Sequence, residues 1–186
     1  LIAIETQRGC ILDCAFCNYQ KGNRALRYFS LERVKGDMEL ILKHQPKTLY
    51  LMDPTFNSNK RRARAILSYI IDNNSSGTTI NAEMLPDVLT DEIIEMSVQA
   101  GFKTVEVGIQ SLNPDAIKLM GRYRDEERLF KNIQFGIESG LYLIPQIIIG
   151  LPGDSYDEFF KTFNMKYFIL SVHIRKIKDI TIDFFL

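Results

Sequence analysis

The 186-residue sequence has little net charge, little histidine and little cysteine. Lysine plus arginine and aspartate plus glutamate number 23 each, so no overall field draws the chain to nucleic acid. No apolar stretch approaches the roughly 18 residues that a membrane-spanning helix needs, and no signal peptide is visible. The basic run at 60–64 opens a helical pattern and is interpreted as a solvated helix face. We therefore expect neither a membrane nor a nucleic-acid partner.

The scarcity of cysteine excludes a disulfide scaffold, because there are only three cysteines in an otherwise globular composition. Hydrophobic residues make up 46% and charged residues 25%, which are ordinary values for a soluble domain. A chain of this length buries a substantial core and is expected to form one domain over residues 1–186. Since Leu1 already lies on a predicted strand, we expect this domain to be a fragment of a longer protein with flanking N- and C-terminal domains.

Apolar runs alternate with helical patterns along the chain, and no low-complexity linker divides them. Predicted strands cover residues 1–4, 48–52, 78–84, 104–109, 143–149 and 180–186. The run at 143–149 is almost continuously apolar, which is typical of a strand covered on both faces. Repeated strand–helix units imply a parallel sheet with right-handed crossovers, and the units are too few for a closed barrel. The expected fold is an α/β partial (β/α)6 open barrel.

Capping residues mark the ends of several predicted helices. Ser30 is a predicted N-cap before an apolar face at 31–42. Gly101 and Gly140 are predicted to end later helices, because glycine readily adopts the left-handed conformation found there. The other predicted helices lie at 63–71, 89–100, from 114 onward and at 129–137.

The last predicted helix opens at a motif that resembles a capping box, formed by Ser155 and Glu158. Phe159, Phe163 and Tyr167 follow at helical spacing. We expect these three aromatic side chains to point inward.

All three cysteines lie within eight residues, in the motif Cys10-Ile-Leu-Asp-Cys14-Ala-Phe-Cys17. Thiolates at C-x3-C-x2-C spacing can each bind one iron of a cubane [4Fe–4S] cluster, which leaves the fourth iron without a protein ligand. An open metal position is typical of a catalytic site, whereas a structural site is closed. The motif therefore indicates an iron–sulfur cluster that takes part in chemistry.

Two other interpretations of the cysteines stay open on spacing alone. A structural zinc site needs a fourth nitrogen or sulfur ligand, and the two histidines, His44 and His173, do not form a zinc-type pair. A thioredoxin-like role for Cys14 and Cys17 leaves Cys10 unexplained.

Polar residues and glycines follow the predicted strands at their carboxyl ends. They are the cysteine loop, Asp53–Asn57, Glu83, Gly108–Ser111 and Gly150–Gly153. Because the carboxyl ends of parallel strands meet at one edge of a sheet, we expect these segments to converge on one ligand site.

In this motif the sequence resembles the radical S-adenosylmethionine (SAM) superfamily. Cys10, Cys14 and Cys17 match the hallmark of that superfamily after its first strand. Phe16 matches the aromatic residue that usually precedes the last cysteine.

The resemblance extends over essentially the whole chain. The segments 107–113 and 149–154 match signatures that many members carry at their fourth and fifth strands. The segments 5–10 and 53–57 are similar to the group whose members often carry an upstream cobalamin-binding domain. The ordered set of motifs is more specific than any one of them.

The resemblance implies a [4Fe–4S] cluster and SAM as cofactors, with cobalamin supplied through a domain outside this chain. The reduced cluster would cleave SAM to a 5′-deoxyadenosyl radical that modifies an unidentified substrate. Some cobalamin-associated members also, or instead, methylate their substrates. An electron donor such as flavodoxin or ferredoxin would be a partner, and a reducing cytoplasm would suit the cysteines.

The resemblance also implies roles for five side chains around SAM. Phe16 is expected to stack near the adenine, Asp53 to pair with the methionyl ammonium and Glu83 to bind the ribose hydroxyls. Gln110 is expected to bind the ribose or the carboxylate, and Arg122 the carboxylate. Structural roles also stay open, with Phe16 as a core aromatic and Arg122 as a helix-surface side chain.

Two alternative functions accompany this expectation. The first is a methylthiotransferase-like enzyme, which would normally need a second cluster, although the sequence has no further cysteines to hold one. The second is a non-catalytic zinc-binding module, which predicts bound zinc and no affinity for SAM.

Overall fold

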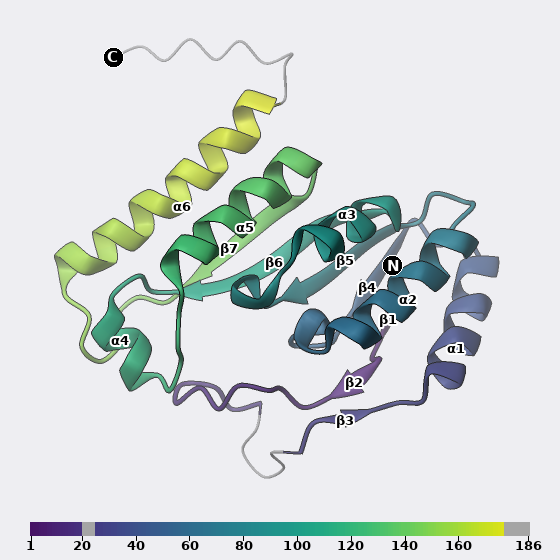
Figure 1. Ribbon diagram of the computed structural model, residues 1–186, viewed down its shortest axis with the longest axis horizontal. Coiled ribbons are helices and arrows are strands. Elements are labelled where there is room, and N and C mark those ends of the chain that lie inside the picture. Colours follow the sequence, from purple (N-terminus) through teal and green to yellow (C-terminus); the bar gives the residue numbers. More distant parts are fainter. Residues whose placement is uncertain (20–24, 177–186) are drawn as a thin grey trace.

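The computed structural model describes residues 1–19 and 25–176 (Figure 1). Its main sheet has five parallel strands in the order β1-β4-β5-β6-β7. These strands are β1 (Ile2–Ile4), β4 (Thr48–Leu51), β5 (Thr79–Met84), β6 (Phe102–Gln110) and β7 (Tyr142–Ile147). The order in space follows the order in the chain, and the sheet stays open, which confirms the predicted fold class. The strand predicted at 180–186 lies outside the described residues.

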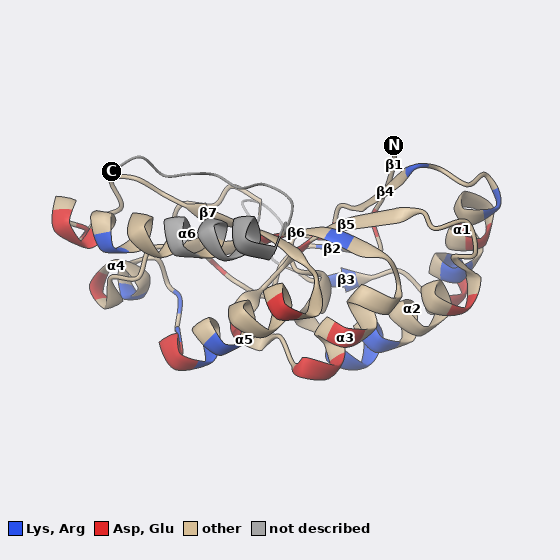
Figure 2. Ribbon diagram, turned by 90° about the horizontal axis from the view of Figure 1, so that it is seen from above, with Lys and Arg blue, Asp and Glu red and all other residues tan. Residues whose placement is uncertain are grey.

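Helices connect successive strands, and two short 3-10 helices follow β4 and β5. The helices are α1 (Leu31–Lys43), α2 (Lys60–Asn73), α3 (Asp91–Gln99), α4 (Pro114–Leu119), α5 (Glu126–Ser139) and α6 (Tyr156–Lys176), and the 3-10 helices are η1 (Phe56–Ser58) and η2 (Pro86–Val88). Figure 2 shows α1, α2, α3 and α5 on the same side of the sheet. No helix within the described ranges combines the length and apolarity needed to cross a membrane.

The predicted capping residues lie where the sequence places them. Ser30 is the N-cap of α1, and its side chain accepts a backbone hydrogen bond from the first turn. Gly101 and Gly140 adopt φ values of 93° and 109°, so each ends its helix in the left-handed region that favours glycine. Ser155 Oγ accepts from the backbone N–H of Glu158 at 3.2 Å, which confirms the N-cap at the start of α6.

One face of the sheet forms the core beneath the helices. The buried strand residues on this face include Leu49, Leu51, Ile80, Ala82, Met84, Val105, Val107 and Leu143. They alternate along each strand with partly exposed residues, as period-2 side chains do when only one face is covered. On the other face the strand side chains are partly exposed, and several of them line the site described below.

Two expectations about apolar segments are wrong. The strand at 143–149 is not covered on both faces, because Tyr142 and Ile144 keep exposed fractions of 41% and 38% on the open face. On α6, Phe163 is 39% exposed, whereas Met165 and Ile169 belong to the core. The helix therefore turns a different face inward, while Phe159 is half-buried and the Tyr167 side chain lies outside the described residues.

A small antiparallel pair, β2 (Gln7–Arg8) and β3 (Arg27–Tyr28), was not predicted. Gln7 pairs with Tyr28 and Arg8 with Arg27. The pair joins the chain just before and just after the cysteine loop, so it closes the base of that loop.

Candidate functional site

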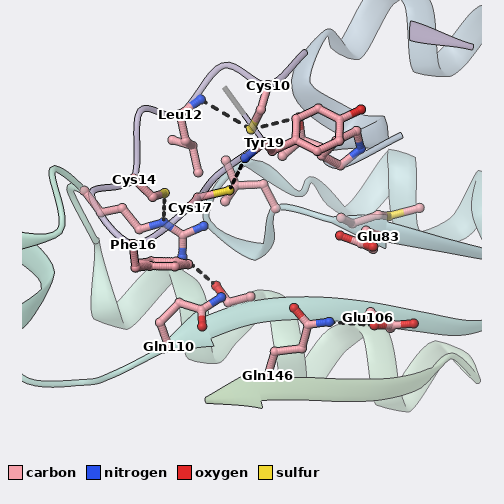
Figure 3. A pocket seen from close by; sticks show the side chains of 16 residues that line it. Cys10, Leu12, Cys14, Phe16, Cys17, Tyr19, Glu83, Glu106, Gln110 and Gln146 are labelled. Carbon is pink, nitrogen blue, oxygen red and sulfur yellow. Dashed lines mark hydrogen bonds between the residues drawn. The ribbon is translucent and has the colours of Figure 1, made fainter. Parts of the chain in front are cut away.

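The carboxyl ends of the strands meet the cysteine loop at a cavity of about 170 Å³. Figure 3 shows side chains from the loop on one side of this cavity and side chains from the strands on the other. Four of the five side chains predicted to bind SAM line it, together with the three cysteines: Phe16, Glu83, Gln110 and Arg122. Four of the five segments expected to converge therefore meet at this cavity, whereas no residue of Gly150–Gly153 lines it.

The three cysteines are all reduced, and they line the same cavity. Cys14 is buried with 9% of its surface exposed, and Cys10 and Cys17 are partly exposed. Each sulfur accepts an N–H hydrogen bond: Cys10 Sγ from Leu12 N at 3.4 Å, Cys14 Sγ from Arg122 Nε at 3.2 Å and Cys17 Sγ from Tyr19 N at 3.4 Å. Such donors stabilise sulfur that carries negative charge, as the thiolate ligands of a cluster do.

The arrangement of the three cysteines can be compared with the needs of a single metal ion and of an iron–sulfur cluster. Within residues 1–19 and 25–176, no three histidine, cysteine, aspartate or glutamate side chains are gathered tightly enough to hold a single metal ion. A cubane cluster spreads its ligands over several irons, so its cysteines lie further apart than the ligands of one zinc ion. The donor set present, three thiols around one cavity, is the set that a cubane cluster with one open iron requires.

Asp53 differs from the other predicted SAM ligands, because it does not line the cavity. Its side chain is fully buried. Oδ1 accepts from the backbone N–H groups of Thr6 at 2.7 Å and Gln7 at 3.1 Å, and Oδ2 accepts from the Thr6 hydroxyl. Burial raises the pKa of Asp53, while these hydrogen bonds and the charge of Arg62 oppose the rise. The carboxylate thus holds the segment that leads into the cysteine loop.

The same segment continues to the first cysteine through Thr55. Gln7 Nε2 donates to the Thr55 carbonyl at 3.0 Å. The Thr55 hydroxyl lies 3.9 Å from Cys10 Sγ. Thr55, in the loop after β4, therefore contacts the chain within β2 at Gln7 and just after β2 at Cys10. These contacts support the start of the cysteine loop.

Arg122 lies between the cysteine loop and the sheet. Besides its bond to Cys14, its Nη1 donates to the Gly108 carbonyl at 3.1 Å. A Cβ at Gly108 would lie 3.6 Å from Arg122 Nη2, an ordinary contact distance, but 2.8 Å from Gln110 Nε2, so the glycine leaves room for the Gln110 amide. The guanidinium is therefore a fixed positive charge at the cavity, not a free helix-surface side chain.

Phe16 is 41% exposed and lines the cavity, so it is not a core aromatic. Gln110 is 7% exposed and lies on the opposite wall. An aromatic face and a primary amide thus face the same space, where they can contact a purine and hydroxyl groups.

A polar band across the open face of the sheet was missed by the sequence analysis. The single proton of the Tyr50 hydroxyl is within reach of Glu83 at 3.3 Å and of Glu106 at 3.5 Å. Gln146 Nε2 donates to Glu106 at 2.6 Å (Figure 3). Burial, together with the two carboxylates, raises the pKa of Tyr50 to about 12. Burial and the charge of Glu106 raise the pKa of Glu83. Period-2 alternation could have found Glu106, but its partners depend on strand register.

Curated proteins resemble most of this chain. An uncharacterised methyltransferase of Pyrococcus horikoshii is 27% identical over 158 residues, which cover 83% of this chain and 34% of that protein. The ribosomal protein uS12 methylthiotransferase of Thermotoga petrophila is 27% identical over 184 residues, which cover 94% of this chain and 42% of that protein. The chain therefore spans less than half the length of either relative.

Among solved structures, the radical SAM methyltransferase TsrM of Kitasatospora setae superposes with a TM-score of 0.81. It is 19% identical, and the match covers 91% of this chain and 34% of TsrM. That likeness concerns the fold.

The family model described as the Radical SAM superfamily matches residues 4–165. The matched region contains the three cysteines, the strands β4 to β7 and every side chain that lines the cavity beside them. This chain belongs to the Radical SAM superfamily.

Proposed function

We propose that Cys10, Cys14 and Cys17 hold a [4Fe–4S] cluster and that SAM binds in the adjoining cavity. The observation that carries this proposal is the set of three reduced thiols around one cavity, each accepting an N–H hydrogen bond. When bound, such a cluster supplies the electron that cleaves SAM and an open iron position for it. The side chains of this chain bind and orient SAM and exclude water.

Arg122 contributes charge at two places. Its Nε bond to Cys14 offsets the negative charge that the thiolate carries. Its guanidinium also faces the cavity, where it attracts a carboxylate such as that of the methionyl part of SAM.

The opposite wall binds the nucleoside part of SAM. Glu83 accepts hydrogen bonds from the ribose hydroxyls, and Gln110 donates and accepts beside it. Phe16 stacks on the adenine from the side of the cysteine loop. The Tyr50 hydroxyl is protonated at neutral pH, as a tyrosine ordinarily is, and it donates to Glu83 and orients that carboxylate.

The sequence suggested that Asp53 contacts SAM, but we propose instead that it supports the cysteine loop. It holds the backbone of Thr6 and Gln7 and lies away from the cavity. We therefore assign it to the support of the cysteine loop.

The reaction we propose is radical modification of a substrate, with methyl transfer as its leading form. A methyltransferase of similar sequence and the similar fold of TsrM, whose structure contains cobalamin and a [4Fe–4S] cluster, support this. Cobalamin would then be held outside this domain, and a flavodoxin or ferredoxin would supply electrons. A reducing compartment such as the cytoplasm suits the three thiols.

A methylthiotransferase is the second candidate, because the uS12 methylthiotransferase matches 94% of this chain. That activity needs a further cluster, and the three cysteines of this sequence all lie in one loop. Under this candidate the chain supplies ligands for one of two clusters.

Product analysis tests the proposal. The chain is reconstituted with iron and sulfide without oxygen, reduced with dithionite and incubated with SAM. We expect 5′-deoxyadenosine, or S-adenosylhomocysteine when cobalamin and a methyl acceptor are present. A chain that forms no cluster with iron and sulfide, binds one zinc ion when zinc is offered and leaves SAM intact would overturn the proposal and favour a structural module.

A further inference from the structure

Arg124 is a buried cation that the proposed reaction does not use. It lies between α4 and α5, and only 7% of its side chain is exposed. It does not line the cavity of the cysteines. Burial lowers its pKa, while the charge of Asp87 opposes this. A buried guanidinium stays charged and needs partners, so its contacts show what it does.

Three of the contacts of Arg124 are carbonyl oxygens at the carboxyl end of β6. Nη1 donates to Ile109 O at 2.5 Å and to Ser111 O at 2.7 Å, and Nη2 to Gly108 O at 3.4 Å. The fourth contact is Asp87 in η2, whose Oδ1 lies 3.2 Å from Nε. The guanidinium therefore ties the end of β6 to the segment after β5.

The backbone that Arg124 surrounds has an unusual conformation. Gln110 has a φ of 67°, in the left-handed region that residues other than glycine rarely adopt. The pairing of β6 with β7 shifts register between Gly108 and Gln110. A conformation of this kind persists only where the surroundings hold it, and Arg124 bonds the carbonyls on both sides of Gln110.

This conformation determines where the Gln110 side chain lies. The side chain lines the cavity opposite the cysteines, with its Nε2 close over Gly108. Glu106 and Gly108 of the same strand also line the cavity, so alternation places Gln110 on this face, and the left-handed φ with the register shift sets where on the face its amide lies. The position of this amide in the cavity thus depends on the turn.

We propose that Arg124 is a positioning residue for SAM: it holds the left-handed turn that keeps the Gln110 amide in the cavity. This inference rests on the proposed function, since it takes SAM to be the ligand of the cavity. Arginine suits the task because its planar fork offers five N–H donors, enough for the three carbonyls and Asp87. Lysine keeps the charge but offers a single nitrogen that cannot span these acceptors.

A double-mutant cycle tests the inference on the full chain. Arg124→Lys, Gln110→Ala and the double variant are reconstituted, and the SAM dissociation constant is measured from the change that SAM causes in the EPR signal of the reduced cluster. We expect each single variant to bind SAM about tenfold more weakly, and the double variant to be no weaker than Gln110→Ala alone. Alanine at position 110 must adopt the same left-handed backbone conformation as glutamine, so the Gln110→Ala variant removes only the side-chain amide.

If Arg124 only stabilised the fold, the double-mutant cycle would give a different pattern of SAM affinities. Arg124→Lys would then weaken SAM binding equally in the parent and in the Gln110→Ala background, and this result would overturn the inference. Arg64→Lys is the matched control, because Arg64 pairs with Glu92 on the surface at 46% side-chain exposure and should change nothing.

A second variant covers the case in which Arg124→Lys does not fold. Asp87→Asn removes the charged partner and keeps the three carbonyl contacts, so we expect a smaller loss of SAM affinity that disappears in the Gln110→Ala background. An equal loss in both backgrounds would contradict the inference. If Gln110→Ala alone binds SAM normally, the inference fails while the proposed function stands; if the parent chain with its cluster binds no SAM, the proposed function fails first.

Discussion

Arg122 Nε donates a hydrogen bond to Cys14 Sγ at 3.2 Å, across 108 residues of sequence. This contact joins the cysteine loop, which follows β1, to the segment that follows α4. The same guanidinium reaches the Gly108 carbonyl on β6. One side chain therefore links the proposed cluster ligand to the strand that carries Gln110.

The Cys14 contact leads to a redox prediction. Hydrogen bonds to ligand sulfur stabilise the reduced, more negative state of a cluster, so Arg122→Met should lower the reduction potential. We expect a shift on the order of 50 mV, close to the 59 mV that corresponds to tenfold for a one-electron couple. An EPR-monitored redox titration measures it, and an unchanged midpoint in a variant with full iron content would show that the contact has no electronic effect.

Asp53 allows a direct comparison between a structural role and a SAM contact. Asp53→Ala leaves two backbone N–H groups and Arg62 without their buried partner, and should lower the free energy of unfolding by about 3 kcal/mol. Asp53→Asn keeps an acceptor and should recover much of this loss. Urea denaturation measures both.

The SAM affinity of Asp53→Asn decides between the two roles. Because Asp53 does not line the cavity, we expect the affinity to stay within about twofold of the parent. A contact with the methionyl ammonium would instead require a loss of about tenfold or more when the charge is removed.

A substitution at Gly108 should change SAM affinity with little effect on the stability of the fold. A Cβ at this position would lie 2.8 Å from Gln110 Nε2, the end of a flexible side chain, so Gly108→Ala should move the amide at a stability cost of about 1 kcal/mol or less. We expect calorimetry to show weaker SAM binding by a chain that melts almost normally. Gly36→Ala, on an open stretch of α1 with nothing within 4 Å, is the control and should add about 0.5–1 kcal/mol of stability. Equal SAM affinity in both variants would contradict the placement of Gln110.

Glu83 predicts a pH dependence of stability. Its pKa is raised above the ordinary value of 4.5, by burial first and then by the charge of Glu106. A carboxyl group with a raised folded-state pKa contributes stability that is fully present below its unfolded pKa and is lost as the pH rises through its folded pKa. Glu83→Gln should therefore gain stability relative to the parent at neutral pH, and the gain should shrink as the pH falls toward 4.5. Unfolding curves at several pH values check this; a difference independent of pH would mean that Glu83 is not the group responsible.

Much of the fold follows from local signals in the sequence. Ser30, Gly101 and Gly140 mark helix ends through backbone chemistry that needs no tertiary context, and each lies at its predicted place. The order of the strands follows from their alternation with helices. By contrast, helical spacing alone predicts that Phe163 points inward, and this prediction is wrong. Spacing shows which residues share one face of a helix, but it does not show whether that face is turned toward the core.

The sequence predicted most of the side chains that line the cavity, but it did not predict the hydrogen bonds between them. Phe16, Glu83, Gln110 and Arg122 line the cavity as the family resemblance implies, whereas Asp53 is turned into the protein by its bonds to Thr6 and Gln7. The bond from Gln146 to Glu106 depends on strand register. No local pattern in the sequence records such a pairing, and only the folded chain shows it.

We propose above that the three cysteines hold a cluster to which SAM binds. The first experiment is EPR of the dithionite-reduced, reconstituted chain with and without SAM, in parallel with the variants Cys10→Ala, Cys14→Ala and Cys17→Ala. We expect a [4Fe–4S]+ signal in the parent that changes when SAM is added, and no such signal in any of the three variants. A parent whose signal ignores SAM, or a single cysteine variant that keeps the full SAM-sensitive signal, would contradict it.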